Sequence, residues 1–207
     1  CERREIVSQI KNVLLGLGLQ EAITYSLIDR DLLTKSGIKP DAQLIEILNP
    51  LSKEQEVLRP TLLPSFIRCL AHNLDQQQEQ ISIFEIANVF SGSGNTVDEG
   101  LSLGIALCGT NSFLVKQGLV RDEFTLLHLK GILEALFDKL GIRDYDFRSQ
   151  GDKGISIIIH QQETGIMLDL KKQVLDVFDI KNKQIILAEI NLEKIFTHIN
   201  LERKFSS

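Results

Sequence analysis

Residues 49–74 have the sequence NPLSKEQEVLRPTLLPSFIRCLAHNL, and residues 81–90 have the sequence ISIFEIANVF. In the first stretch, Pro60 ends any helical turn that precedes it. Apolar residues then recur at three- and four-residue spacing, which predicts a helix from about residue 63 to 74. Pro64 is compatible with the first turn of that helix, where a missing N–H has no partner to lose. The second stretch is apolar on both faces, which predicts a strand in the middle of a sheet.

Upstream of this stretch, the sequence predicts two helices and two strands. Apolar residues at helical spacing from Ile6 to Leu17 form one stripe, and Gly16 and Gly18 end that helix because glycine adopts a left-handed conformation at little cost. Residues 21–28 contain β-branched and aromatic side chains and predict a strand. The other two predicted elements are a short helix between Asp29 and Gly37 and a strand over residues 43–48.

Downstream, short strands alternate with helices. Large and small residues alternate over residues 101–108, which predicts a strand with a close neighbour on one face. Residues 109–123 are predicted to be irregular. The longest helix is predicted over residues 124–140, where Gly131 indicates a close approach by another part of the chain. The remaining predicted elements are strands at 145–149, 155–160, 165–170 and 184–190, a helix at 171–178, and a final helix at 192–198 capped by Asn191.

This order of elements predicts an α+β fold in which helices flank a mostly antiparallel sheet. The 207 residues are 43% hydrophobic and 25% charged, which is typical of a soluble globular chain, and we expect a single domain over residues 1–207. No apolar run approaches the ~18 residues of a membrane span, and no signal peptide is visible. Because the chain begins with Cys1 rather than Met, we interpret it as a piece of a longer protein.

Charge and cysteine usage exclude some classes of function. The net charge of −5 argues against a broad nucleic-acid-binding face, which needs an excess of Lys and Arg. Cys1, Cys69 and Cys108 form no CxxC pair, so we expect neither a zinc site nor a dithiol site. An odd number of cysteines fits the cytoplasm better than secretion.

No catalytic arrangement is visible from residue spacing. The glycine-rich residues 91–96 lack the Lys-Ser/Thr of a phosphate loop, so a hairpin turn is predicted there. The four histidines share no ligand spacing and predict no metal site. Glu85 could act as a general base, but a carboxylate at such a strand position more commonly faces a groove or an ion-pair partner. Lysines and aspartates alternate over residues 169–183, which is typical of a solvated face.

Residues 49–90 resemble the core, synthetase-like domain of the phenylalanine–tRNA ligase beta subunit. The family shows an N-P-L-S turn, an L-R-x-x-L-L-P helix start and an L-F-E-I-G-x-V-F strand, and this chain has NPLS, LRPTLLP and IFEIANVF in that order. Three further matches cover almost the whole chain: LLGLGLQEAITYSL at 14–27, HLKGILEALFDKLGI at 128–142 and DLKKQVLDVFDIKNKQIILAEINLEKIF at 169–196.

The resemblance implies the fold of class II synthetases without their activity. Catalytic members use arginines to neutralise ATP phosphates in the transition state. In the related catalytic alpha chain, an arginine follows the strand that resembles ANVF, whereas this chain has Ser91 there. Residues 188–195 also lack the Gly-x-x-Arg of the catalytic class, although Arg59 and Arg68 remain at helix-start positions. The resemblance therefore implies a non-catalytic domain with no catalytic, cofactor-binding or metal-binding residues of its own.

The resemblance also implies partners. The domain would scaffold the catalytic alpha subunit in a cytoplasmic alpha2-beta2 complex, and that parent complex would use ATP, magnesium and tRNA. Since the first helix and strand of class II enzymes lie at a subunit contact, we expect Leu15, Leu17, Tyr25 and Leu127 to meet the alpha subunit.

Two other functions stay open. An active class II-type adenylating ligase would be revealed by ATP binding. An interaction domain unrelated to translation would be favoured if the chain failed to co-purify with an alpha chain.

Overall fold

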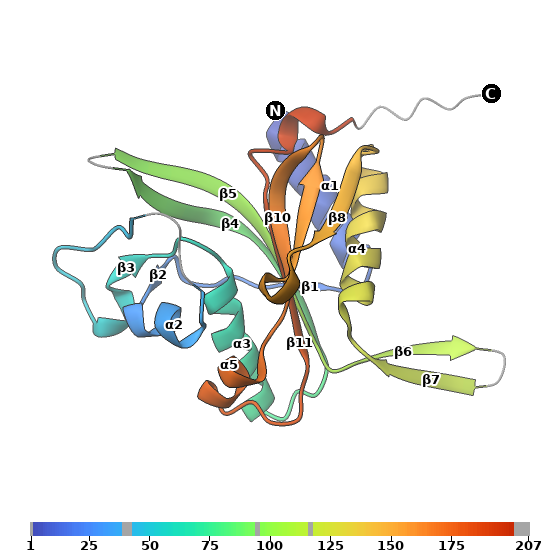
Figure 1. The fold of residues 1–207 in the computed structure, drawn as a ribbon, viewed down its shortest axis with the longest axis horizontal. Coiled ribbons are helices and arrows are strands. Elements are labelled where there is room, and N and C mark those ends of the chain that lie inside the picture. The colour runs from blue at the N-terminus through green and yellow to red at the C-terminus, as the bar shows by residue number, and fades with distance from the viewer. Residues whose placement is uncertain (1, 39–42, 94–95, 116–117, 201–207) are drawn as a thin grey trace.

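The computed structural model describes residues 2–38, 43–93, 96–115 and 118–200. A seven-stranded sheet passes through the middle of the molecule (Figure 1). Its strands follow the order β1 (Gln20–Glu21), β4 (Ile81–Ser93), β5 (Thr96–Cys108), β11 (Ile185–Asn191), β10 (Gln162–Asp169), β9 (Ile155–Ile159) and β8 (Tyr145–Ser149). Among the strand pairs that the structure describes, β1–β4 alone is parallel, so the predicted α+β class with a mostly antiparallel sheet is confirmed.

Helices cover both faces of the sheet. One face packs against α1 (Glu2–Gly16) and α4 (Leu126–Lys139), and the other packs against α3 (Leu63–Asp75) and α5 (Lys172–Val177) (Figure 1). The predicted helical stripes supply most of the contacts, since α1 buries Ile10 and Leu14 while α3 buries Ile67 and Leu70. Leu17 differs from the prediction, because it lies beyond the end of α1 and is exposed.

The predicted strand at residues 21–28 is divided. Its first residues form β1, and the amide of Ala22 still donates to the carbonyl oxygen of Phe84 at 2.8 Å. The chain then leaves the sheet and pairs again only as β2 (Leu27–Ile28) with β3 (Val57–Leu58). Between the two strands Thr24 binds the carboxylate of Glu85, and this tertiary contact overrides the local strand propensity.

The neighbouring segments agree better with the sequence. The predicted short helix is α2 (Arg30–Lys35), and Asp29 caps it by accepting from the amide of Leu32. A turn of 3-10 helix, η1 (Lys53–Gln55), follows Ser52. The strand predicted at residues 43–48 is wrong, because only isolated bridges form there, from Gln43 to Gly92 and from Glu46 to Val57.

Residues 109–123 are not irregular. They contain β6 (Thr110–Val115) and β7 (Gly118–Glu123), an antiparallel hairpin that extends away from the body of the molecule (Figure 1). Within the described ranges, these two strands pair only with each other. Because no neighbouring strand requires a buried face, the sequence lacks the alternation by which a half-buried strand is recognised.

Two helix predictions also need correction. A Cβ built on Gly131 of α4 would meet no atom within 4 Å, so this glycine is not explained by a close approach. The final helix is reduced to a short 3-10 turn, η3 (Phe196–His198), although Asn191 does accept from the amide of Lys194 at 3.2 Å.

The structure also bears on membrane spans and on the cysteines. Within the described ranges, no helix is both long and apolar enough to cross a membrane. Cys69 and Cys108 are free thiols, whereas Cys1 and the centre of the predicted turn at 94–95 lie outside the described residues.

Candidate functional site

Two carboxylates lie side by side on the face of the sheet that α3 covers. Glu85 belongs to β4 and Glu189 belongs to β11, and both are in register with Gly104 of the intervening strand β5. Because side chains alternate along a strand, Glu85 shares its face with Ile83, and Glu189 shares the same face with Leu187. The sheet therefore carries a row of carboxylate, glycine and carboxylate under the start of α3.

The aromatic ring of Phe66 packs directly over the glycine of this row, Gly104. A Cβ added to Gly104 would lie 2.2 Å from Cε2 of Phe66, a residue of α3 that is fully buried. Only glycine permits this approach, which confirms the predicted close neighbour of β5. The space between the two carboxylates is therefore filled by protein and is not open to a ligand.

Glu85 is neutralised by Arg59, which is 1% exposed. Nη1 of Arg59 lies 3.2 Å from Oε1 of Glu85 and donates to Oγ1 of Thr24 at 2.7 Å, and Nε donates to the carbonyl oxygen of Asn88 at 3.0 Å. Thr24 donates its amide and its hydroxyl to the two carboxylate oxygens of Glu85, at 3.1 and 2.7 Å. A buried charge needs such partners, and here the chain itself supplies them.

Glu189 acts as the N-terminal cap of α3. The cap position is Leu62, which has no side-chain acceptor. Oε2 of Glu189 instead accepts from the amide of Leu62 at 3.1 Å and from the hydroxyl of Thr61. Desolvation raises the pKa of Glu189, while hydrogen bonds from Thr61, Leu62 and Ser102 act in the opposite direction. A carboxylate from the sheet thus meets the positive end of the helix dipole.

The arginines that could bind phosphate are placed apart. Arg59 is enclosed and paired with Glu85, so its charge does not reach solvent. Arg68 lies on α3, is half-buried, and approaches Oδ2 of Asp29 at 3.6 Å. Ser91 sits in the β4–β5 hairpin, in register with Asp98. The described residues therefore bring no pair of free arginines together over this face of the sheet.

The predicted interface residues lie on two parts of the molecule. Leu15 and Leu17 are at the end of α1 and are 50% and 44% exposed, and Leu127 is in the first turn of α4 at 76%. Tyr25 is 75% exposed on the segment that crosses to the α3 side. The sequence does not predict that Arg59 pairs with Glu85, because the two residues are 26 positions apart. It also does not predict the exposure of Leu48 and Leu51.

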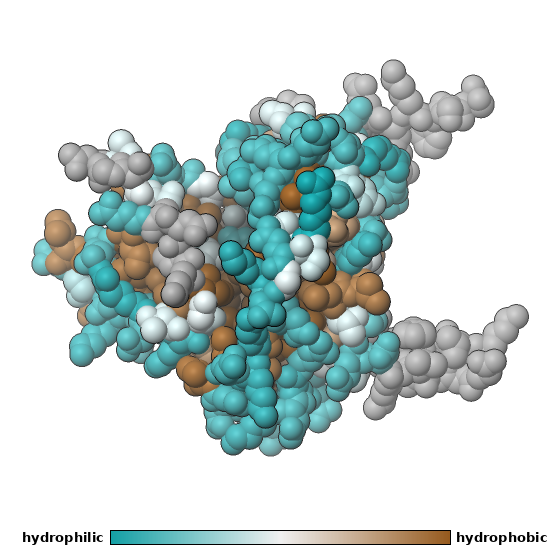
Figure 2. All heavy atoms as spheres, viewed as in Figure 1, coloured by the Kyte–Doolittle hydropathy of each residue, from teal (hydrophilic) through white to brown (hydrophobic). Residues whose placement is uncertain are grey.

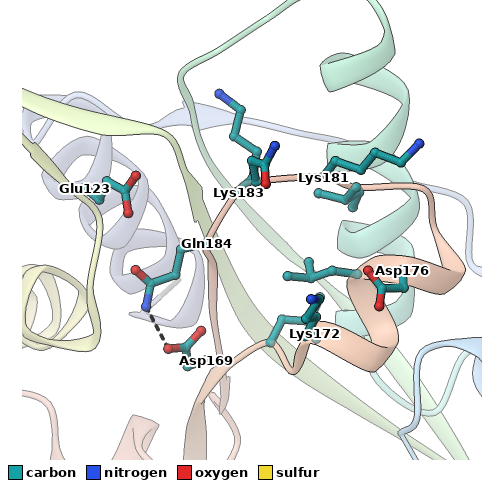
Figure 3. A pocket seen from close by; sticks show the side chains of 11 residues that line it. Glu123, Asp169, Lys172, Asp176, Lys181, Lys183 and Gln184 are labelled. Carbon is teal, nitrogen blue, oxygen red and sulfur yellow. Dashed lines mark hydrogen bonds between the residues drawn. The ribbon is translucent and has the colours of Figure 1, made fainter.

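A separate cavity of about 630 Å³ lies between β7 and α5 (Figure 3). Leu170, Leu175 and Ile180 form its apolar lining. Three lysines and three acids also line it, namely Lys172, Lys181, Lys183, Glu123, Asp169 and Asp176. Asp169 accepts from Gln184 at 2.7 Å, and Lys181 lies 2.8 Å from Asp179. Balanced, partly paired charges at the surface select for no one sign of ligand, in keeping with the predicted solvated face.

Among the residues that the structure describes, no group of three or more His, Cys, Asp or Glu side chains is placed to hold a metal ion. His160 and His198 do stack, with ring centroids 4.1 Å apart, and Nδ1 of His160 lies 3.4 Å from Asp144. Stacked rings direct their nitrogen lone pairs side by side and do not converge on one ion.

Comparisons with known proteins agree with this architecture. Residues 2–192 match the family model described as the phenylalanyl tRNA synthetase beta chain CLM domain. The phenylalanine–tRNA ligase beta subunit of Carboxydothermus hydrogenoformans is 34% identical over 210 residues, and that of Fusobacterium nucleatum is 32% identical over 209 residues. Each alignment covers 96% of this chain but 26% of the relative, so the chain spans about a quarter of their length.

Solved structures show the same fold at lower identity. Two structures of pyrrolysyl-tRNA synthetase from Desulfitobacterium hafniense superpose with a TM-score of 0.71 at 16% and 17% identity. The alignments cover 93% of this chain and 65% and 67% of those chains. At this identity the likeness establishes a synthetase-like fold alone.

Proposed function

Because this chain belongs to the family of phenylalanyl-tRNA synthetase beta chain CLM domains, we propose that it is a non-catalytic, synthetase-like domain that scaffolds a catalytic alpha subunit. The observation that carries the proposal is the state of Arg59. Arg59 lies over the sheet, but it is 1% exposed and bound to Glu85. A synthetase fold whose arginine is paired within the protein can support a neighbouring subunit, but that arginine is not free to bind ATP and activate an amino acid.

Electrostatics supports the absence of adenylate formation. Charge builds on the phosphates of ATP in the transition state, and loss of one stabilising group typically costs 10²–10³ in rate. Ser91 is uncharged, and residues 188–195 contain no arginine; their one cation, Lys194, donates to the carbonyl oxygen of Glu163 at 2.9 Å. Phe66 fills the space above Gly104, and Glu189 adds negative charge to the same face when it is ionised. An anionic nucleotide would meet neither room nor a cation there.

The parent assembly follows from the same premise. We infer an alpha2-beta2 complex of the cytoplasm that uses ATP, magnesium and tRNA, with this domain supporting the alpha subunit. Leu15, Leu17, Tyr25 and Leu127 are the proposed contacts, because each is a large apolar side chain with substantial exposure.

An ATP–pyrophosphate exchange assay tests the proposal. We expect no phenylalanine-dependent exchange from this chain alone, normal exchange from the complete complex, and co-purification of the chain with the alpha subunit. Exchange by the chain alone would refute the non-catalytic role. Failure of the wild-type chain to bind the alpha subunit would refute the scaffold role.

The contact residues have their own test. Leu15→Glu places a charge on a half-exposed position of α1, so the fold should tolerate it while binding to the alpha subunit weakens. Unchanged binding by Leu15→Glu, with the circular dichroism spectrum retained, would exclude α1 from the interface.

A further inference from the structure

The loop between α2 and α3 presents two leucines to solvent. Leu48 and Leu51 are each 95% exposed and flank the Asn49-Pro50 turn. Figure 2 shows apolar side chains gathered on the side of the molecule where Figure 1 places β2, β3 and this loop. We call Leu48 and Leu51 the leucine pair. Single exposed leucines are ordinary, whereas here two almost fully exposed leucines stand within four residues of one loop.

The base of this loop is held in place by backbone hydrogen bonds. The amide of Ile47 donates to the carbonyl oxygen of Glu56 at 2.8 Å, and the amide of Leu58 donates to that of Ile45 at 2.9 Å. The amide of Glu56 in turn donates to Ile28 of β2 at 3.2 Å. The loop is therefore tied to the β2–β3 pair, and ordering it on binding would cost little conformational entropy.

The size of the leucine pair restricts what can cover it. Complete burial of a leucine removes on the order of 100 Å² from water, so the pair offers about 200 Å². A specific interface buries about 800 Å² on each partner. The pair is too small to hold a separate protein by itself, so it can contribute only as one of several contacts with the same occupant.

We propose that the leucine pair inserts into an apolar recess of the alpha subunit, as a second contact beyond those of α1 and α4. This inference rests on the scaffold function proposed above, which supplies a subunit held by other contacts. Figure 1 places α1 and α4 on the opposite side of the sheet from the loop, so the leucine pair is spatially distinct from Leu15, Leu17 and Leu127. Tyr25, the remaining proposed contact, lies two residues before β2, the strand to which the loop is tied, so an alpha subunit that contacts Tyr25 already reaches this side. The alpha subunit would reach around the sheet to touch both sides.

Photo-crosslinking in the intact alpha–beta complex identifies the occupant. Leu51→p-benzoylphenylalanine in the complete beta chain should crosslink to the alpha subunit on irradiation. The same replacement at Val177, a 55%-exposed residue of α5, is the matched control and should give no such product. A crosslink confined to the beta chain, a crosslink to tRNA, or no crosslink at position 51 would overturn the proposal.

Affinity measurements give an independent test. Leu48→Ser and Leu51→Ser should each weaken binding of the alpha subunit about tenfold, as buried interface anchors do. Val177→Ser should leave binding unchanged. If the wild-type chain binds and the double variant binds within about twofold of it, the leucine pair is not a contact and the scaffold function stands. If the wild-type chain does not bind at all, both proposals fail.

Discussion

Removal of the Glu85 carboxylate should destabilise the domain more than removal of any surface charge. Glu85→Leu leaves the guanidinium of Arg59 at 1% exposure without its counter-charge, and it frees the amide and hydroxyl of Thr24. Breaking a buried pair from one side costs about 3–5 kcal/mol. Arg59→Met should cost a similar amount, because it leaves a buried carboxylate and an unpaired carbonyl oxygen at Asn88.

The double variant separates the ion pair from general damage. Arg59→Met with Glu85→Leu removes both charges and leaves only neutral groups of Thr24 and Asn88 unpaired, each at about 1–3 kcal/mol. We therefore expect the double variant to lose about 5 kcal/mol, against about 8 for the sum of the single losses. The coupling energy would be about 3 kcal/mol, at the upper end for contacting residues.

Urea unfolding followed by circular dichroism measures these differences. With a slope of about 2 kcal/mol per molar urea, each single variant should shift the midpoint by about 2 M. The control is Glu134→Ala, which breaks the 42%-exposed Lys130–Glu134 pair of α4 and should cost under about 0.5 kcal/mol. Single variants within about 1 kcal/mol of wild type, or additive losses in the double variant, would refute the role assigned to the buried pair.

Three further outcomes are expected from urea unfolding. Gly104→Ala should lose about 1–3 kcal/mol, because its Cβ would lie 2.2 Å from the Phe66 ring; equal stability would mean that the ring moves freely. Gly131→Ala should gain about 1 kcal/mol, since nothing lies within 4 Å and the helix interior favours alanine; a loss would reveal a hidden contact. Burial raises the pKa of Glu189 above its ordinary 4.5, so the folded chain binds that proton more tightly than the unfolded chain does. The resulting stability is fully present below pH 4.5 and is lost as pH rises through the raised pKa of folded Glu189. Glu189→Gln should therefore flatten the pH dependence of the urea midpoint, and an unchanged pH dependence would contradict this.

Elements with a local cause were predictable from the sequence. The helical stripe and Pro64 of α3 are local, and so is the apolar run of β4 that identifies a strand between two neighbours. The hairpin β6–β7 was missed because, among the described strands, its two strands pair only with each other, and its sequence shows no alternation of apolar and polar residues. Residues 22–26 were misassigned because Thr24 exchanges strand pairing for the carboxylate of Glu85.

The candidate site was less predictable than the fold. The sequence places Glu85 in a buried strand and Arg59 before a helix, but it does not show that the two side chains meet. Glu85 and Glu189 become neighbours only through the register of β4 and β11 on Gly104. Register between distant strands is set by the packing of the whole sheet and not by any local pattern.

The position of β11 sets when this domain can be completed during synthesis. Residues 185–191 arrive last among the strands, yet they pair with β5 on one side and with β10 on the other. Until they leave the ribosome, the nascent sheet consists of two halves with open inner edges, which are prone to wrong pairing. The two halves of this sheet must therefore wait for β11, the last of the described strands, before they can join.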